Sequence, residues 1–282
     1  MDISESEFKK RYRLSKEAFK FLCQELRSKT NLRASKRISL ELKVLCALSF
    51  YATGSYQRLV GMGKHLGQTS VSKCVTQVTE ALNDPSITNT FIKFPTSRTE
   101  RDAIKQKFFR KYNIPGVCGC IDASHFHIYK PRKEIEHLFY CRKHFHSINV
   151  QMVVDSECRI LSINAKYGGA THDAFIWENR QVNSYMQELH RNHEQVWLLG
   201  DSGYPQRPWL MTPITDAVEG SPEANYTSLH ALKFGVPDPE NDPTIQEDPV
   251  SQPTESIAGN TSSSGDLIRG RALRRLLVDR LN

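Results

Sequence analysis

The chain has 282 residues and a formal net charge of +7, from 38 Lys and Arg against 31 Asp and Glu. This length can hold one large domain or two smaller ones, and no apolar run is long enough to cross a bilayer. The first residues lack the apolar core of a secretory signal peptide. Seven cysteines without the spacing of a disulfide framework favour reduced thiols in an intracellular compartment.

The basic charge is concentrated in the N-terminal third. Residues 1–110 contain 21 Lys and Arg but 10 Asp and Glu, whereas residues 236–266 contain seven acidic residues and no Lys or Arg. A module that binds a polyanion such as DNA has this kind of positive excess. A solvated helical surface would explain the same excess, so the charge alone leaves both interpretations open.

Residues 1–110 are predicted to be helical. Ser15 and Ser39 are typical N-caps, and each precedes apolar residues at helical spacing. Residues 61–67 then form a glycine-punctuated turn before a Ser- and Thr-rich helix, which is the order of a helix-turn-helix. In that interpretation six polar residues face a DNA groove: Gln68, Thr69, Ser70, Ser72, Lys73 and Gln77. A three-helix bundle that serves only as a scaffold fits the same residues.

The sequence changes to a strand pattern after Asn113. Four strands are predicted, at residues 117–122, 147–155, 160–167 and 196–199. Between the last two, Thr171 is the expected N-cap of one helix that continues to about Met186. Cys118 and Cys120 are expected to be core thiols on one face of the first strand. A strand, a hairpin pair, a crossover helix and a further strand predict a mixed α/β fold.

Two apolar strands end at an aspartate, Asp122 and Asp201, and these lie 79 residues apart. A carboxylate at a strand end can face a cleft while the strand itself stays in the core. If the two strands are neighbours, the carboxylates can hold divalent metal ions, which stabilise the attacking and leaving oxygens in phosphoryl transfer. Asp is also common where strands end and turns begin, so the pattern alone has an ordinary structural explanation as well.

Four segments carry a family resemblance: GCIDASHFHI, HSINVQMVVD, GGATHDAFIW and LLGDSGYPQRPWLMTP. With these motifs in this order, about residues 8–235 resemble the Harbinger transposase-derived nuclease family, domesticated relatives of the PIF/Harbinger DDE transposases. The resemblance implies a ribonuclease-H-like fold and metal-dependent hydrolysis of DNA phosphodiester bonds. It also implies a nuclear location, with the cytoplasm as a second compartment, and a Myb-like partner protein for DNA binding or nuclear entry.

The resemblance assigns roles to individual residues. Asp122 matches the first catalytic acid, Asp201 the second, and Asp173 an additional acidic position that is expected to bind metal. A second interpretation of Asp173 is a helix N-terminal residue that the helix dipole favours. Oxygen ligands favour Mg²⁺ or Mn²⁺ over zinc. Polar-core or phosphate-contact roles, rather than zinc ligation, are expected for the nearby histidines: His125, His127, His144, His146 and His172.

One part of the family pattern is absent. The resemblance implies a third catalytic acid on a long helix after Asp201. Residues 225–231 resemble the start of that helix, but residues 232–240 resemble sequence that normally lies well beyond it, so a segment with the glutamate is inferred to be missing. The nearby glutamates are unconvincing substitutes: Glu219, Glu223 and Glu240. Weaker metal binding, reduced or lost activity, and an uncovered apolar sheet face behind Asp201 are therefore expected.

The predicted organisation has four parts: a helical region at 1–110, a ribonuclease-H-like DDE nuclease domain at 111–235, a disordered acidic linker at 236–266, and a short basic helix at 267–282. The basic helix is expected to dock on the core, with nuclear import as a second role for its arginines. Two classes of function remain open. One is a metal-dependent DNA nuclease, and the other is a catalytically inactive transposase descendant that acts as a nuclear DNA- or protein-binding factor.

Overall fold

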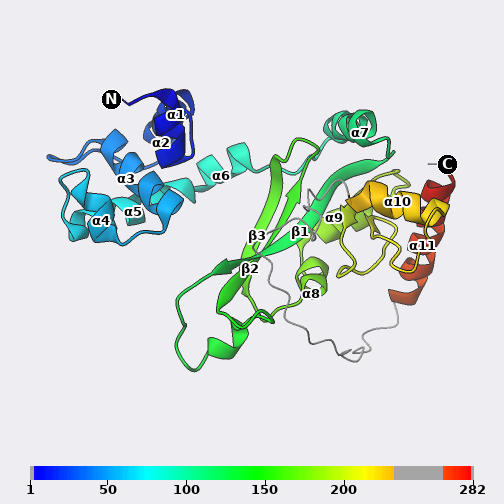
Figure 1. Ribbon diagram of the computed structural model, residues 1–282. Helices are drawn as coiled ribbons and strands as arrows, with labels where there is room; N and C mark the ends of the chain where they lie inside the picture. The colour runs from blue at the N-terminus through cyan, green and yellow to red at the C-terminus, as the bar shows by residue number, and fades with distance from the viewer. Residues whose placement is uncertain (1–2, 232–262, 281–282) are drawn as a thin grey trace. The chain divides into compact units, whose positions relative to one another are not determined.

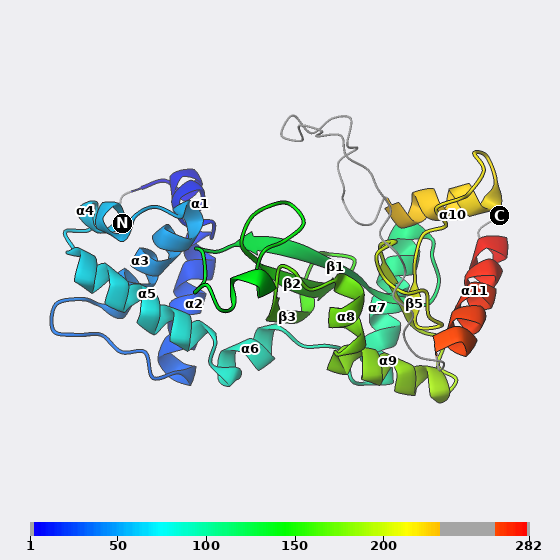
Figure 2. The ribbon, with the colours of Figure 1, turned by 90° about the horizontal axis from the view of Figure 1, so that it is seen from below.

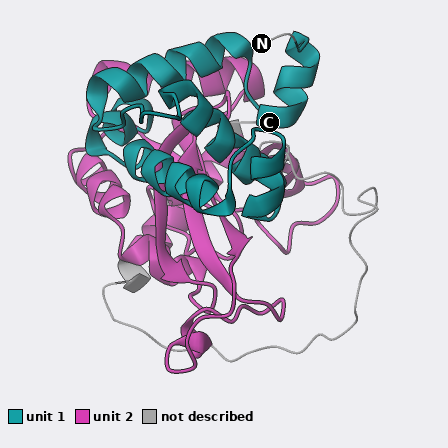
Figure 3. Ribbon diagram, turned by 90° about the vertical axis from the view of Figure 1, so that its left-hand side faces the viewer, with its two compact units in different colours: residues 1–92 teal, residues 93–282 magenta. Residues whose placement is uncertain are grey.

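The computed structural model describes residues 3–231 and 263–280 (Figure 1). The chain falls into two compact units, residues 1–92 and 93–282 (Figure 3), and each is described separately. The first unit is helical and the second contains a mixed five-stranded sheet, so the predicted α/β class and the helical N-terminal region are confirmed. The division lies at Ile92 rather than at residue 110, because α7 (Arg98–Tyr112) packs on the sheet. Of the predicted acidic linker, only 263–266 lie within the described residues, and these are helical.

The described part of the first unit contains α1 (Glu5–Tyr12), α2 (Lys16–Lys29), α3 (Leu40–Thr53), α4 (Gln57–Met62), α5 (Gln68–Leu82) and α6 (Pro85–Phe91). Both predicted N-caps are confirmed. The Oγ of Ser15 accepts a hydrogen bond from the Ala18 amide at 3.0 Å, and the Oγ of Ser39 accepts one from the Leu42 amide at 3.1 Å. Each cap satisfies a backbone donor that has no partner inside its helix.

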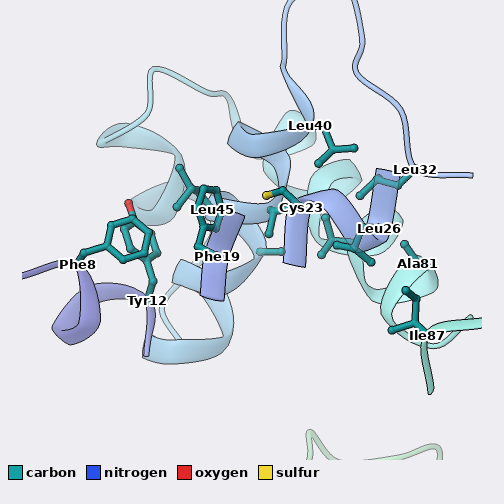
Figure 4. Packing of buried hydrophobic residues seen from close by; sticks show 13 residues of the cluster. Phe8, Tyr12, Phe19, Cys23, Leu26, Leu32, Leu40, Leu45, Ala81 and Ile87 are labelled. Atoms are coloured by element: carbon teal, nitrogen blue, oxygen red, sulfur yellow. The ribbon is translucent and has the colours of Figure 1, made fainter. Parts of the chain in front are cut away.

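An apolar core holds the first unit together (Figure 4). The Phe8 ring packs on the rings of Tyr12 and Phe19, with centroids 4.7 and 5.6 Å apart. Leu26 of α2 and Val44 of α3 are fully buried in the same cluster. Burying one such side chain stabilises a fold by about 1.5–3 kcal/mol. The helical unit therefore has a hydrophobic core of its own.

The second unit continues from α7 with β1 (Val117–His127), the 3₁₀ turn η1 (Glu136–Leu138), β2 (Ser147–Val154), β3 (Ile160–Gly168), α8 (Asp173–Glu178), α9 (Gln181–Arg191), β4 (Trp197–Gly200), β5 (Leu210–Met211), α10 (Pro222–Ala231) and α11 (Ser263–Arg280). The strand order in the sheet is β3-β2-β1-β4-β5. β2 is antiparallel to β1 and β3, whereas β4 is parallel to β1 and β5. This is the mixed, ribonuclease-H-like winding that the sequence predicts.

Helices α8 and α9 cover one face of this sheet through a cluster that includes the buried side chains of Trp177 and Met186. Cys118 belongs to this cluster, whereas Cys120 belongs to the cluster on the opposite face. Both cysteines are buried as expected, but the prediction that they share one face is wrong. β1 shifts its register between Val117 and Gly119, and an irregularity of this kind exchanges the faces of the following residues.

Helices α7, α10 and α11 cover the opposite face, and α10 and α11 lie side by side (Figure 2). Leu273 and Leu277 of α11 pack in one cluster with Leu199 and Met211 of the sheet, which are fully buried. The expectation of an uncovered apolar face behind Asp201 is therefore wrong. The C-terminal helix, which begins at Ser263 rather than at 267, docks on the core and supplies the cover.

The one helix predicted between Thr171 and Met186 is two helices in the structure. Thr171 is not a cap, because α8 begins at Asp173 and His172 occupies the N-cap position. Arg180 then takes an extended conformation (φ −106°, ψ 139°) that separates α8 from α9. Its guanidinium is buried under the sheet, where it forms hydrogen bonds that a continuous helix would not allow.

Candidate active site

Asp122 and Asp201 follow paired positions on neighbouring parallel strands. Ile121 of β1 lies opposite Gly200 of β4, and the next residue along the chain is the aspartate in both cases. β4 ends there, whereas β1 continues to His127 and pairs only with β2. Because Ile121 and Gly200 are paired on adjacent parallel strands, the aspartates that follow them are neighbours, and the charge of Asp201 acts on Asp122.

One backbone amide holds each of these carboxylates. The Oδ1 of Asp122 accepts a hydrogen bond from the Ala123 amide at 2.7 Å, and the Oδ1 of Asp201 accepts one from the Gly203 amide at 3.0 Å. The second oxygen of each carboxylate has no hydrogen bond within the described parts of the chain. One oxygen per aspartate is thus held in place, and the other is open to a ligand.

Both carboxyl groups have a raised pKa. Protein atoms around Asp122 exclude part of its water, and this desolvation is the main cause, with the negative charges of Asp201 and Asp173 adding to it. Desolvation also raises the pKa of Asp201, with a contribution from Asp173 that the positive charge of Arg142 partly opposes. Both side chains still reach solvent. Negative charges gathered in this way repel one another, and a bound divalent cation would relieve the repulsion.

Asp173 opens α8 beside this pair and is held by a polar network. Its Oδ1 accepts a hydrogen bond from Asn149 Nδ2 at 2.7 Å, and its backbone oxygen accepts one from Gln151 Nε2 at 3.2 Å. The same amide of Gln151 donates to the Tyr204 hydroxyl at 3.1 Å, and its Oε1 accepts from Arg180 at 2.9 Å. The network joins α8 to β2 and to the segment after β4. Asp173 remains open to either of its predicted roles.

These supporting residues were not predicted, although β2 carries a signal for them. Ser147, Asn149 and Gln151 occupy alternate positions of the strand, and all three are buried. A buried strand face with a polar residue at every second position must find hydrogen-bond partners inside the protein. The burial of Arg180 could not be predicted from the sequence pattern, because it depends on the break between α8 and α9. Desolvation lowers the pKa of Arg180 to about 10.

No glutamate among the described residues takes the place of the third catalytic acid that the family resemblance implies. Within 3–231 and 263–280, no three His, Cys, Asp or Glu side chains form a group that could hold a metal ion. The negative charges of Asp173 and Asp201 contribute to the raised pKa of Asp122, but the three aspartates do not form such a group. Glu223 of α10 pairs with Arg275 of α11, and Glu219 is exposed before that helix. Glu240 lies outside the described residues.

Two histidines near the site have other partners. His125 Nδ1 lies 3.0 Å from the Ser147 hydroxyl, and His146 Nε2 lies 3.0 Å from a carboxylate oxygen of Glu136. Among the described residues, neither histidine belongs to a group of three potential metal ligands. The seven cysteines, all within the described residues, form no disulfide.

The six residues predicted to face a DNA groove all lie on α5, after a close turn from α4. A Cβ on Gly61 would lie 2.2 Å from the Leu66 carbonyl oxygen, so the two helices require glycine at this approach. Gln68, Thr69 and Lys73 are exposed, whereas Ser70 and Ser72 are half-buried. Gln77 accepts a hydrogen bond from the buried ammonium of Lys43 at 2.8 Å, which ties it to α3. The helix-turn-helix and the scaffold interpretations both stay predictions.

Comparisons with known families and proteins decide the lineage. Residues 121–233 match the DDE superfamily endonuclease family, and this stretch contains all three aspartates. "Putative nuclease HARBI1" of Bos taurus is 34% identical over 202 residues, which are 72% of this chain and 56% of the relative. The chain belongs to the Harbinger-derived nuclease family.

Other relatives of this Harbinger-derived chain extend the comparison. The protein of the same name from Homo sapiens is also 34% identical over the same shares of both chains. "Protein ALP1-like" of Arabidopsis thaliana is 24% identical over 79% of this chain and 59% of its own length. The chain thus spans little more than half the length of these curated relatives. No solved structure is significantly similar to it. In the part of the chain that the structure describes, no helix is both long and apolar enough to cross a membrane.

Replacing Asp201 by asparagine is expected to stabilise the fold at neutral and higher pH. A carboxyl group with a raised pKa in the folded state contributes stability below its unfolded pKa, and loses it as the pH rises through the folded pKa. Asparagine removes the charge but keeps the oxygen that accepts from Gly203. Because the side chain reaches solvent, we expect a modest rise of about 2 °C in Tm at pH 8. The difference should vanish near pH 4 in thermal melts without divalent metal, and a lower Tm at pH 8 would contradict the expectation.

Proposed function

We propose that this chain is a metal-dependent nuclease of Harbinger transposase descent that hydrolyses DNA phosphodiester bonds. The strand register that brings Asp122 and Asp201 to one edge of the sheet carries the proposal. The match of residues 121–233 to DDE superfamily endonucleases supports phosphodiester hydrolysis as the reaction of these carboxylates. A nuclear location and a Myb-like partner protein belong to the proposal on the strength of the family resemblance alone.

The residues present fit a divalent cation. Asp122 and Asp201 each offer an uncommitted oxygen, and their raised pKa values mark a place where positive charge is favourable. The buried Oδ1 of Asn149, beside Asp173, has no hydrogen-bond partner in the described part of the chain. These are hard oxygen donors, which favour Mg²⁺ or Mn²⁺. When bound, such an ion would activate water and stabilise the charge that develops on the phosphodiester oxygens.

The protein groups have separate roles in this proposal. Asp122 and Asp201 would hold the ion, and Asp173 is proposed as a further ligand from the start of α8, although the three side chains do not form one ligand group in the described residues. Gln151 and Arg180 keep that start in place through the network below the carboxylates. A two-metal DDE site needs a further acid, and the described residues supply none. We therefore expect this chain to hydrolyse DNA slowly.

The same observation favours a second candidate function. Without the further acid, the fold could serve as a catalytically inactive nuclear factor that binds DNA or protein. This candidate predicts DNA binding without cleavage under any metal condition.

Conversion of supercoiled plasmid to the nicked form separates the two candidates. The full chain is incubated with Mg²⁺, with Mn²⁺, or with EDTA. The nuclease proposal predicts nicking that appears with either ion and disappears with the chelator. Intact plasmid in all three conditions, together with a gel shift, would refute the nuclease proposal and support the binding factor.

A further inference from the structure

The segment between β1 and β2, residues 128–146, extends beyond the ends of these two strands (Figure 1). We call it the β1–β2 arm. It contains five Lys or Arg residues and two Glu. One of these glutamates, Glu136, is already paired with Lys130 at 3.0 Å and lies equally close to His146. The remaining cations of the arm are Arg132, Lys133, Arg142 and Lys143, for which the described structure shows no ion pair.

The arm is anchored to the segment that leads to Asp173. A Cβ on Gly168 would lie 2.0 Å from the Leu138 carbonyl oxygen, and one on Gly169 would lie 3.0 Å from the Phe139 carbonyl oxygen of the arm and 2.0 Å from the Ser147 hydroxyl of β2. No side chain fits at either position. The two glycines of the GGATHD motif therefore allow the backbone of the arm to pack directly against their own backbone. The Ala170 amide also donates a hydrogen bond to Leu138 at 3.2 Å. Anchoring of this kind gives the arm a defined position beside the site.

Two cations of the arm lie next to each other in one exposed turn. Arg142 and Lys143 are exposed in the tight turn between Cys141 and Phe145, which the hydrogen bond from the Cys141 amide to the Phe145 oxygen closes at 2.9 Å. The positive charge of Arg142 opposes the rise in the Asp201 pKa. Both cations also disfavour protonation of His125, whose lowered pKa results mainly from desolvation. Positive charge that is exposed and unpaired beside catalytic carboxylates is suited to a phosphate of the substrate.

The arm also exposes an aromatic side chain at its base. Tyr129 is 95% exposed, and it follows directly from the last residues of β1. At this exposure its ring is accessible to a ligand. Beside exposed cations, such rings commonly stack on the bases of a nucleic acid.

We propose that the β1–β2 arm binds the DNA backbone next to the scissile bond, with Arg142 and Lys143 contacting phosphates and Tyr129 packing on the adjacent nucleotide. This inference rests on the proposed nuclease function, which it deepens by assigning the DNA-contact surface. It places a determinant of DNA affinity in the second unit, separate from the α5 residues of the first.

Fluorescence anisotropy with a labelled short DNA duplex tests the arm in EDTA, where cleavage cannot interfere. The double variant R142A/K143A removes the two proposed phosphate contacts. A matched control, R191A/R269A, removes two exposed cations from α9 and α11. Arg191 ends the helix that leads to the start of β4, at the opposite end of the strands from Asp201. Circular dichroism and thermal melting verify that all proteins are folded.

The arm variant is expected to bind about tenfold more weakly than the unmodified chain. The slope of log affinity against log salt should become shallower by about 2, since each lost phosphate contact removes about 0.9. The control should retain the slope of the unmodified chain. Equal binding by the arm variant and the control would overturn the proposal, as would an unmodified chain that binds no duplex.

The proposed DNA contact of the arm and the proposed nuclease activity are refuted by different results. Binding that depends on the arm, with no nicking of plasmid in Mg²⁺ or Mn²⁺, refutes the nuclease and leaves the arm as a DNA-contact surface. Metal-dependent nicking with a folded arm variant that binds and nicks like the control refutes the arm alone. The variant Y129A adds a separate readout, because loss of ring packing should weaken binding without changing the salt slope.

Discussion

Replacing Asp122 by asparagine is expected to reduce plasmid nicking by at least about 100-fold, because changes to groups that only support metal ligands already cost 10–100-fold. Asparagine keeps the size of the side chain and the oxygen that accepts from the Ala123 amide. It removes the negative charge that would hold a divalent cation together with Asp201. The effect should therefore fall on catalysis rather than on folding, and the rate of nicking in Mn²⁺ measures it.

A matched variant makes the result specific. Asp216 is an exposed aspartate of the same unit, beyond β5, and D216N should nick plasmid at the rate of the unmodified chain. The melting temperature of D122N without metal should equal or exceed that of the unmodified chain, because the Asp122 carboxyl has a raised pKa. Nicking by D122N at the unmodified rate would contradict the assignment of Asp122 as a catalytic residue.

Replacing Leu277 by alanine is expected to lower the free energy of unfolding by about 2–5 kcal/mol, which is the usual cost of Leu→Ala in a packed core. Leu277 is 3% exposed and packs in the cluster that contains Leu199 and Met211 of the sheet. The substitution would leave a cavity between α11 and the strands behind Asp201. Urea unfolding followed by tryptophan fluorescence measures the change, and Trp197 lies in the same cluster.

The neighbouring Leu276 provides the control. It has the same chemistry and lies on the same helix, but 56% of it is exposed. L276A should change the free energy of unfolding by no more than about 0.5 kcal/mol, as is usual for surface positions. If L277A and L276A unfolded at the same urea concentration, α11 would not be the cover of this sheet face.

Much of the second unit could be predicted from sequence because its central strands are continuous apolar runs. The run before Asp122 and the run before Asp201 are buried on both faces. A strand of this kind can be recognised from its continuous apolar sequence, without an alternation of apolar and polar residues. The extension of β1 to His127 was missed, because those residues leave the core and alternate between exposed and half-buried. β5 was missed because it has only two residues, Leu210 and Met211.

The candidate site divides in the same way. The aspartates could be found because Asp122 and Asp201 directly follow buried apolar runs and Asp173 begins a helix, which are positions that the sequence marks. Their supports could not be found directly, because Tyr204 and Arg180 meet Gln151 only after three separate segments have packed. Docking of the C-terminal helix on the core was predicted, but the sheet face that α11 covers was not, since that depends on a contact with strands some 60 residues or more earlier in the chain.

Binding of Mn²⁺ tests the central claim most directly. Electron paramagnetic resonance of free Mn²⁺ reports the bound ion without requiring DNA or cleavage. The unmodified chain should bind the ion, and D122N and D201N should each lower its affinity by at least about tenfold, while D216N leaves it unchanged. Equal Mn²⁺ affinity in all four proteins would show that the carboxylates of Asp122 and Asp201 do not share a cation.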